Sequence, residues 1–160
     1  MDQEMLIKTS RNVFGTILKM LENKGMKKLD INEEELKVNF TAQGDDFPID
    51  TYFTVLPERQ VVRIASPLPF RVPEDKRVDT AIAITMVNNN LLNGSFNMDF
   101  SDGYLEFRLL EAYHESLIGP DVFDYLLSIL WLSVDEYNDK LFALIKGMMT
   151  MEQFIQSINS

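Results

Sequence analysis

The side chains that could carry out acid–base chemistry are one histidine and several carboxylates. His114 is the only histidine, and Glu111 and Glu115 lie beside it in the sequence. A general base must lie within hydrogen-bond reach of a nucleophile or a substrate proton, and no nucleophile motif surrounds His114. We therefore expect His114 to be an exposed loop residue. A carboxylate-based enzyme that uses His114 is the alternative from the class of catalysts.

Several carboxylates lie close together in the sequence and are therefore candidate metal ligands. Two short acidic runs lie in predicted turns, where such side chains are normally solvated. Asp121 and Asp124 lie at the start of a predicted helix, where the helix dipole favours negative charge. The segment 99–103 resembles part of a calcium loop, but the distal glutamate that completes such a loop is missing. The sequence therefore predicts no metal, no cofactor and no catalytic residue.

Net charge limits the classes of partner. The 160 residues carry a formal charge of −10. Because this charge would repel phosphate backbones and anionic lipid surfaces, we expect neither nucleic acid nor a membrane as a partner. A basic or amphipathic protein partner is compatible with the charge, which in its simplest interpretation only keeps the chain soluble.

The absence of cysteine excludes disulfides, thiolate catalysis and cysteine-ligated zinc. The N-terminal residues lack the basic and apolar stretches of a signal peptide. No apolar run approaches the roughly 18 residues of a membrane span. These features together predict a cytoplasmic protein, and the length is that of one domain.

Apolar spacing divides the first half of the chain into a helix and three strands. Residues 3–24 are predicted to form a helix, because Val13, Ile17 and Leu21 recur at helical spacing. Strands are predicted where apolar residues alternate with polar ones and turn-forming residues separate the runs. These strands cover residues 36–41, 49–55 and 61–67.

The second half begins with another helix and two more strands. A helix is predicted over residues 74–92, and strands over 96–100 and 105–109. Asp102 and Gly103 join the two strands with a dipeptide that favours a tight hairpin. The residues assigned to one stripe of the helix are Val78, Ile82, Thr85 and Asn89.

The C-terminal region is predicted to be helical from Pro120 onward. Ser133 begins a sequence that fits a capping box, so the helix is either continuous or broken there. A second capping box, at Thr150 and Gln153, predicts a short terminal helix. The order is therefore α-βββ-α-ββ-α plus a short terminal helix. Hairpin connections predict an antiparallel five-stranded sheet packed by helices, which is the α+β class.

The long helix carries more apolar surface than one contact face needs. One stripe follows Leu127 and Leu130, and a second stripe lies roughly opposite at about 100° per residue. The second stripe is buried under another part of the chain, or it forms a surface for a partner or a second copy. The residues of this candidate partner-binding surface are Val122, Tyr125, Ile129 and Leu132.

Three consecutive asparagines end the second predicted helix. Asparagine is a poor helix former because its side chain competes for backbone hydrogen bonds. We therefore expect Asn88 or Asn89 to hydrogen-bond the backbone of a neighbouring strand or loop. Contact with a ligand is the alternative role.

The segment that runs from residue 84 to residue 108 resembles the core of the YbjN family. In that family, a helix with spaced asparagines leads into a Gly-x-Phe strand, an Asp-Gly hairpin and a long C-terminal helix. The position of an earlier family asparagine holds Thr85 in this chain. The matching residues here are Asn88, Leu91, Gly94, Phe96, Asp102 and Gly103.

The resemblance implies a single YbjN-like domain over residues 1–160, with a fold similar to that of type III secretion chaperones. YbjN proteins are described as bacterial sensory transduction regulators, which implies a non-enzymatic module that acts through protein–protein contacts. A homodimer is one arrangement that the second stripe of the long helix would support. A dedicated secretion chaperone for an effector protein is the alternative within this class. A small-ligand sensor is an alternative from another class.

Overall fold

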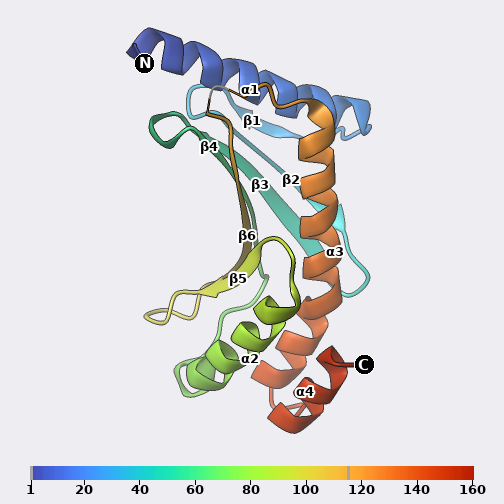
Figure 1. Ribbon diagram of the computed structural model, residues 1–160. Helices are drawn as coiled ribbons and strands as arrows, with labels where there is room; N and C mark the ends of the chain where they lie inside the picture. The colour runs from blue at the N-terminus through green and yellow to red at the C-terminus, as the bar shows by residue number, and fades with distance from the viewer. Residues whose placement is uncertain (1, 115) are drawn as a thin grey trace.

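The computed structural model describes residues 2–114 and 116–160. Within these residues, six strands form one antiparallel sheet in the order β1-β2-β3-β4-β6-β5 (Figure 1). The strands are β1 (Asp30–Asn32), β2 (Lys37–Gln43), β3 (Pro48–Leu56), β4 (Val61–Pro67), β5 (Ser95–Met98) and β6 (Leu105–Ala112). The α-helices are α1 (Gln3–Asn23), α2 (Arg77–Asn90), α3 (Pro120–Ile145) and α4 (Met151–Ile158).

The prediction of a five-stranded sheet is wrong, because β1 adds a sixth strand at the edge. Its three residues are all exposed, and the strand pairs only with β2. Ile31 is its only apolar residue, so the strand shows none of the alternation that identifies longer strands. The antiparallel pairing and the α+β class are confirmed.

One face of the sheet packs against α1 and α3 and forms the core (Figure 1). The alternation predicted for the longer strands is confirmed. Every second residue points into this core, starting at Val38 in β2 and at Ile49 in β3. The opposite face, which we call the outer face, carries the intervening residues. Fully buried core residues from both layers include Ile17, Leu21, Phe53, Ile64, Phe107, Leu127 and Leu130.

Helix α3 runs through Ser133 without a break. Leu130 and Val134 lie on either side of that residue and are both buried, so an interruption would remove one of them from the core. The 26 residues give a helix about 39 Å long. The predicted cap at Thr150 is confirmed: its Oγ1 accepts from Gln153 N, and Gln153 Oε1 accepts from Thr150 N. No helix among the described residues combines the length and the apolar character that crossing a bilayer requires.

Candidate protein-binding surfaces

The asparagine motif fixes α2 to the edge of the sheet. Asn88 Nδ2 donates to Phe96 O at 3.0 Å, and Asn88 Oδ1 accepts from Phe96 N at 2.8 Å. One amide side chain therefore satisfies both backbone groups of a residue in β5, the edge strand. The predicted bond from an asparagine to a neighbouring strand is confirmed, and Asn88 makes it.

The two glycines of the motif have backbone conformations that other residues rarely adopt. Gly94 has φ +78°, and a Cβ atom there would lie 2.5 Å from the Phe107 ring. Gly103 has φ +75°, and a Cβ atom there would lie 1.9 Å from Val72 O. Phe96, between them, is buried and its ring contacts Phe107 at 5.0 Å between centroids. These residues build the β5–β6 hairpin.

The hairpin loop holds its own carboxylates through hydrogen bonds. Asp99 accepts from the N and Oγ of Ser101, and these bonds lower the pKa of Asp99. Asp102 accepts from Tyr104 N and forms an ion pair with Arg71, which lowers the pKa of Asp102. The resemblance to a calcium loop is thus accounted for by local turn bonds. The described residues contain no group of three or more metal-ligating side chains.

His114 is exposed in the turn after β6, as the sequence predicts. Glu111 lies nearby on β6 and is partly buried, whereas Glu115 lies outside the described residues. The carboxylates of Asp121 and Asp124 lie at the start of α3, and Asp124 pairs with Lys24, the residue that follows α1. The His114 surroundings therefore consist of an exposed turn and a strand end.

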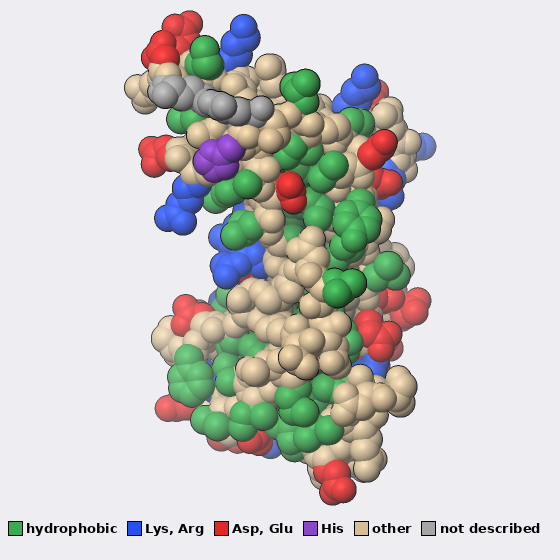
Figure 2. All heavy atoms as spheres, viewed as in Figure 1, with side chains coloured by type: hydrophobic (Ala, Val, Ile, Leu, Met, Phe, Trp, Pro, Cys, Tyr) green, Lys and Arg blue, Asp and Glu red, His purple; other side chains and the backbone are tan. Residues whose placement is uncertain are grey.

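The candidate partner-binding residues, Val122, Tyr125, Ile129 and Leu132, lie on the side of α3 that the core leaves uncovered, and we name them the α3 stripe. Tyr125 is 62% exposed and Leu132 is 73% exposed, and Val122 is also exposed. Ile129 differs from the others, because it is only partly exposed and packs against the core. Figure 2 shows hydrophobic side chains along the upper half of α3. The stripe is therefore solvent-accessible in the single chain, and its role as a partner surface remains a prediction.

Carboxylates lie at both ends of the α3 stripe. Asp121 and Glu136 fall within about 40° of Tyr125 around the helix. Both are exposed, and Glu136 forms an ion pair with Lys140 at 2.9 Å. An apolar segment with basic residues at its ends would match this surface in shape and charge.

A second apolar surface lies on α2, where the sequence prediction assigned the helix stripe. Val78 is 60% exposed and Ile82 is 50% exposed, whereas Ala83 and Val87 on the other side are buried. Val78 and Ile82 line a shallow hollow together with Phe100. Figure 2 shows a gathering of hydrophobic side chains over α2. The stripe assigned to the predicted helix is therefore its solvent side, not its core side.

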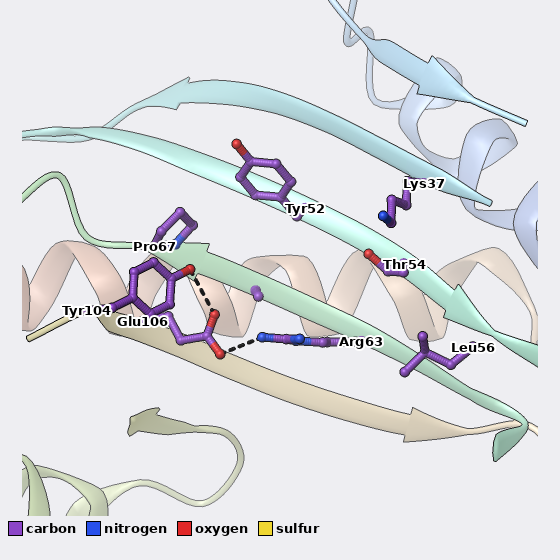
Figure 3. Close-up of a pocket in the computed structure, with 9 residues that line it drawn as sticks. Lys37, Tyr52, Thr54, Leu56, Arg63, Pro67, Tyr104 and Glu106 are labelled. Atoms are coloured by element: carbon purple, nitrogen blue, oxygen red, sulfur yellow. Dashed lines mark hydrogen bonds and ion pairs between the residues drawn. The ribbon is translucent and has the colours of Figure 1, made fainter. Parts of the chain in front are cut away.

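The outer face of the sheet contains a hollow of about 580 Å³ (Figure 3). It forms because Ala65 lies between Tyr52 on β3 and Arg108 on β6 and has only a methyl side chain. Lys37 and Leu56 lie at one end of the hollow, and Pro67 and Tyr104 lie at the other (Figure 3). The residues that line it are Lys37, Tyr52, Thr54, Leu56, Arg63, Ala65, Pro67, Tyr104 and Glu106.

Glu106 lines this hollow, and only 7% of its side chain is exposed. Among the described residues that line the hollow, it is the only acidic one. It pairs with Arg63 Nη2 at 2.6 Å and with Arg108 Nη1 at 3.6 Å, and it accepts from the Tyr104 hydroxyl at 3.2 Å. Burial and the Glu106 carboxylate raise the pKa of Tyr104, which favours the protonated, donating phenol. Sequence alternation places Glu106 and Arg108 on one face of β6, and it gives no sign that they meet Arg63 or Tyr104.

Comparison with known proteins gives structural likeness only. No family model matches the chain, and no curated protein matches it. A structure of the ExsC–ExsE complex matches with a TM-score of 0.60 and 13% identity, over 82% of this chain and 95% of that chain. YbjN from E. coli, proposed to be a transcription regulator, matches with a TM-score of 0.55 and 12% identity, over 79% and 91% of the two chains.

The HopA1–SchA chaperone–effector complex matches more weakly, with a TM-score of 0.48 and 10% identity, over 92% of this chain and 96% of that chain. The first two likenesses confirm the fold that the resemblance to the YbjN family predicts. At these identities the likeness concerns the fold alone.

Proposed function

We propose that this protein is a cytoplasmic, non-enzymatic binding protein that holds a segment of another protein on the α3 stripe. The observation that carries the proposal is the exposure of Tyr125 and Leu132 on a helix whose opposite side is fully packed. Large apolar side chains that remain exposed beside one another are typical of interaction sites. The ExsC chain, which shares the fold, is in a complex with ExsE, and this supports a protein partner.

The charges around the α3 stripe favour a different protein over a second copy. In a two-fold pair of antiparallel α3 helices, Asp121 of one copy would lie near Glu136 of the other. Like charges that face each other oppose association. We therefore propose an apolar partner segment flanked by basic residues, which also suits a chain with a charge of −10. A dedicated secretion chaperone would be one member of this functional class.

The test compares two leucine substitutions in capture experiments from the native host. Leu132→Asp places a charge in the α3 stripe, and Leu92→Asp places the same charge at a fully exposed position elsewhere. We expect one or more proteins to be retained by the unchanged chain and by Leu92→Asp, and to be lost with Leu132→Asp. The purified partner should then bind with at least about tenfold lower affinity to Leu132→Asp, because desolvating a carboxylate in an apolar contact is costly.

Two results would refute the proposed function. Equal retention of every partner by both variants would mean that the α3 stripe is not the binding surface. Conversion of a dimer into a monomer by Leu132→Asp, measured by sedimentation velocity, would assign the stripe to self-association. Circular dichroism should show both variants folded, since both leucines are largely exposed.

A further inference from the structure

Lys37 and Arg63 line the hollow of Figure 3, and Arg108 lies beside it on β6, opposite Ala65. Arg63 and Arg108 share the single buried carboxylate of Glu106, so one guanidinium charge is not neutralised within this group. Lys37 adds a third cation two strands away from Arg63 and pairs with the exposed Glu35. A local excess of positive charge is unusual in a chain whose net charge is −10.

The two arginines retain the capacity to bind another acidic group. Their side chains are 40% and 38% exposed, so both are accessible from the hollow or its margin. A guanidinium has five N–H donors, and Arg63 donates to Glu106 through Nη2. Arginine binds carboxylates through paired, charge-assisted hydrogen bonds. Glu106 holds both guanidinium groups in place while leaving donors free.

The other side chains of the hollow would contact the apolar part of a ligand. Tyr52 is 41% exposed and lies opposite Ala65, whose side chain is small, in the pairing of β3 with β4. At one end Pro67 lies beside Tyr104, whose ring is also covered by Arg71 at 5.6 Å. The hollow thus offers donors in its middle and aromatic or apolar surface at its ends. Its volume is within the roughly 300–1,000 Å³ of typical ligand sites.

We propose that this hollow binds an acidic segment of a partner protein, with a carboxylate on Arg63 and Arg108 and a ring or apolar side chain against Tyr52. This proposal rests on the proposed function as a protein-binding module. It adds a second site, which prefers acidic segments, whereas the α3 stripe prefers basic ones. Helix α3 packs on the opposite face of the sheet from the hollow. A partner that contacts both surfaces would carry basic and acidic segments in separate stretches of its chain.

Two labelled peptides test the proposal on the full-length chain. One is a fluorescein-labelled heptapeptide with six glutamates around a central tyrosine, and the other carries six glutamines instead. Fluorescence anisotropy at low salt should show binding of the glutamate peptide at least about tenfold tighter than that of the glutamine peptide. Affinity for the glutamate peptide should fall as sodium chloride is raised.

Three variants locate the binding. Arg108→Gln should weaken the glutamate peptide about fivefold, as expected for the loss of one partly exposed ion pair. Arg11→Gln removes the same charge from an exposed position on α1, and should change affinity less than about twofold. Tyr52→Ser provides a second change in the hollow and should also weaken the peptide. Circular dichroism confirms that each variant is folded.

The result is distinguishable from that of the α3 test, because Leu132→Asp should leave peptide affinity unchanged. Equal binding of both peptides, or equal loss of affinity in Arg108→Gln and Arg11→Gln, would overturn the proposal. Displacement of the glutamate peptide by inorganic phosphate, but not by chloride at the same ionic strength, would assign the hollow to small anions and would also overturn it. If the α3 test fails and the peptide result holds, the outer face is the protein-binding surface.

Discussion

Replacing Asn88 by alanine should loosen the attachment of α2 to the edge of the sheet. The side chain of Asn88 makes two hydrogen bonds to the backbone of Phe96, at 2.8 and 3.0 Å, and is partly buried. Without it, a buried residue of the edge strand β5 has two backbone groups with no partner from α2. The substitution should therefore lower the free energy of unfolding.

The magnitude follows from two opposing effects. Each hydrogen bond contributes about 1 kcal/mol net, so the loss of both costs about 2 kcal/mol. Alanine is favoured over asparagine within a helix by about 0.6 kcal/mol, which offsets part of the loss. Asn88→Ala should thus destabilise the protein by about 1.4 kcal/mol. Asn89→Ala, at an exposed neighbouring position, should instead stabilise it by about 0.6 kcal/mol.

The assay is urea denaturation of both variants at 25 °C, followed by the fluorescence of Trp131. That residue is the only tryptophan and donates to Thr51 at 3.1 Å, so its emission reports on the packing of α3 against the sheet. The comparison with Asn89→Ala removes the effect of helix propensity and leaves the two hydrogen bonds, with an expected difference of about 2 kcal/mol. A difference below about 0.5 kcal/mol would refute the assignment of Asn88 as the link between α2 and β5.

Three further predictions concern the hairpin loop and the core. Gly103→Ala should destabilise the protein by at least about 2 kcal/mol, because the new Cβ atom would collide with backbone and the residue would keep a strained positive φ. Gly147→Ala, at a position with φ +71° and open space, should cost only about 1 kcal/mol. Equal losses of stability in thermal denaturation would contradict this prediction. Asn138→Leu should raise the free energy of unfolding by about 1 kcal/mol, since both amide atoms are buried and meet no partner among the described residues. A lower free energy of unfolding in urea denaturation would show that the amide is needed. In an NMR titration, Asp99 and Asp102 should have pKa values below the ordinary 3.8 of an aspartate. Their contribution to stability is therefore present above that pH and is lost as the pH falls through the lowered pKa values. Ordinary pKa values would mean that the loop hydrogen bonds do not persist in solution.

Local patterns were enough to predict most of the elements, because their apolar residues are spaced for one buried face. The core side of β2 and β3 and the cap at Thr150 follow from spacing and side-chain chemistry alone. Strand β1 could not be predicted in this way. Its pairing with β2 satisfies backbone groups, not side chains, and it buries nothing.

The orientation of α2 and the composition of the outer-face hollow depend on tertiary structure. Val78 and Ile82 have the spacing of a core stripe, yet β5 and α4 cover the other side of the helix. Arg63 and Glu106 meet because β4 pairs with β6, which follows it only after α2 and β5 in the chain. Sequence alternation assigns Glu106 to one face of β6, but nothing in either strand specifies its neighbour.

Helical geometry predicts the α3 stripe but leaves open whether another part of the chain covers it. Tyr125 and Leu132 fall opposite the residues that pack against the sheet, and few other elements remain to cover them. Ile129 was grouped with them by angle, but its partial burial makes it a poor site for a test.

Site-specific photo-crosslinking tests the central claim most directly, because the chain has no cysteine of its own. Leu132→Cys and Leu92→Cys each provide a unique attachment point for a benzophenone group, at two exposed positions. In the native host extract, we expect position 132 to form a discrete adduct with another protein and position 92 to form none. Identical adducts from both positions, or an adduct of the chain with itself from position 132, would contradict a heterologous partner on the α3 stripe.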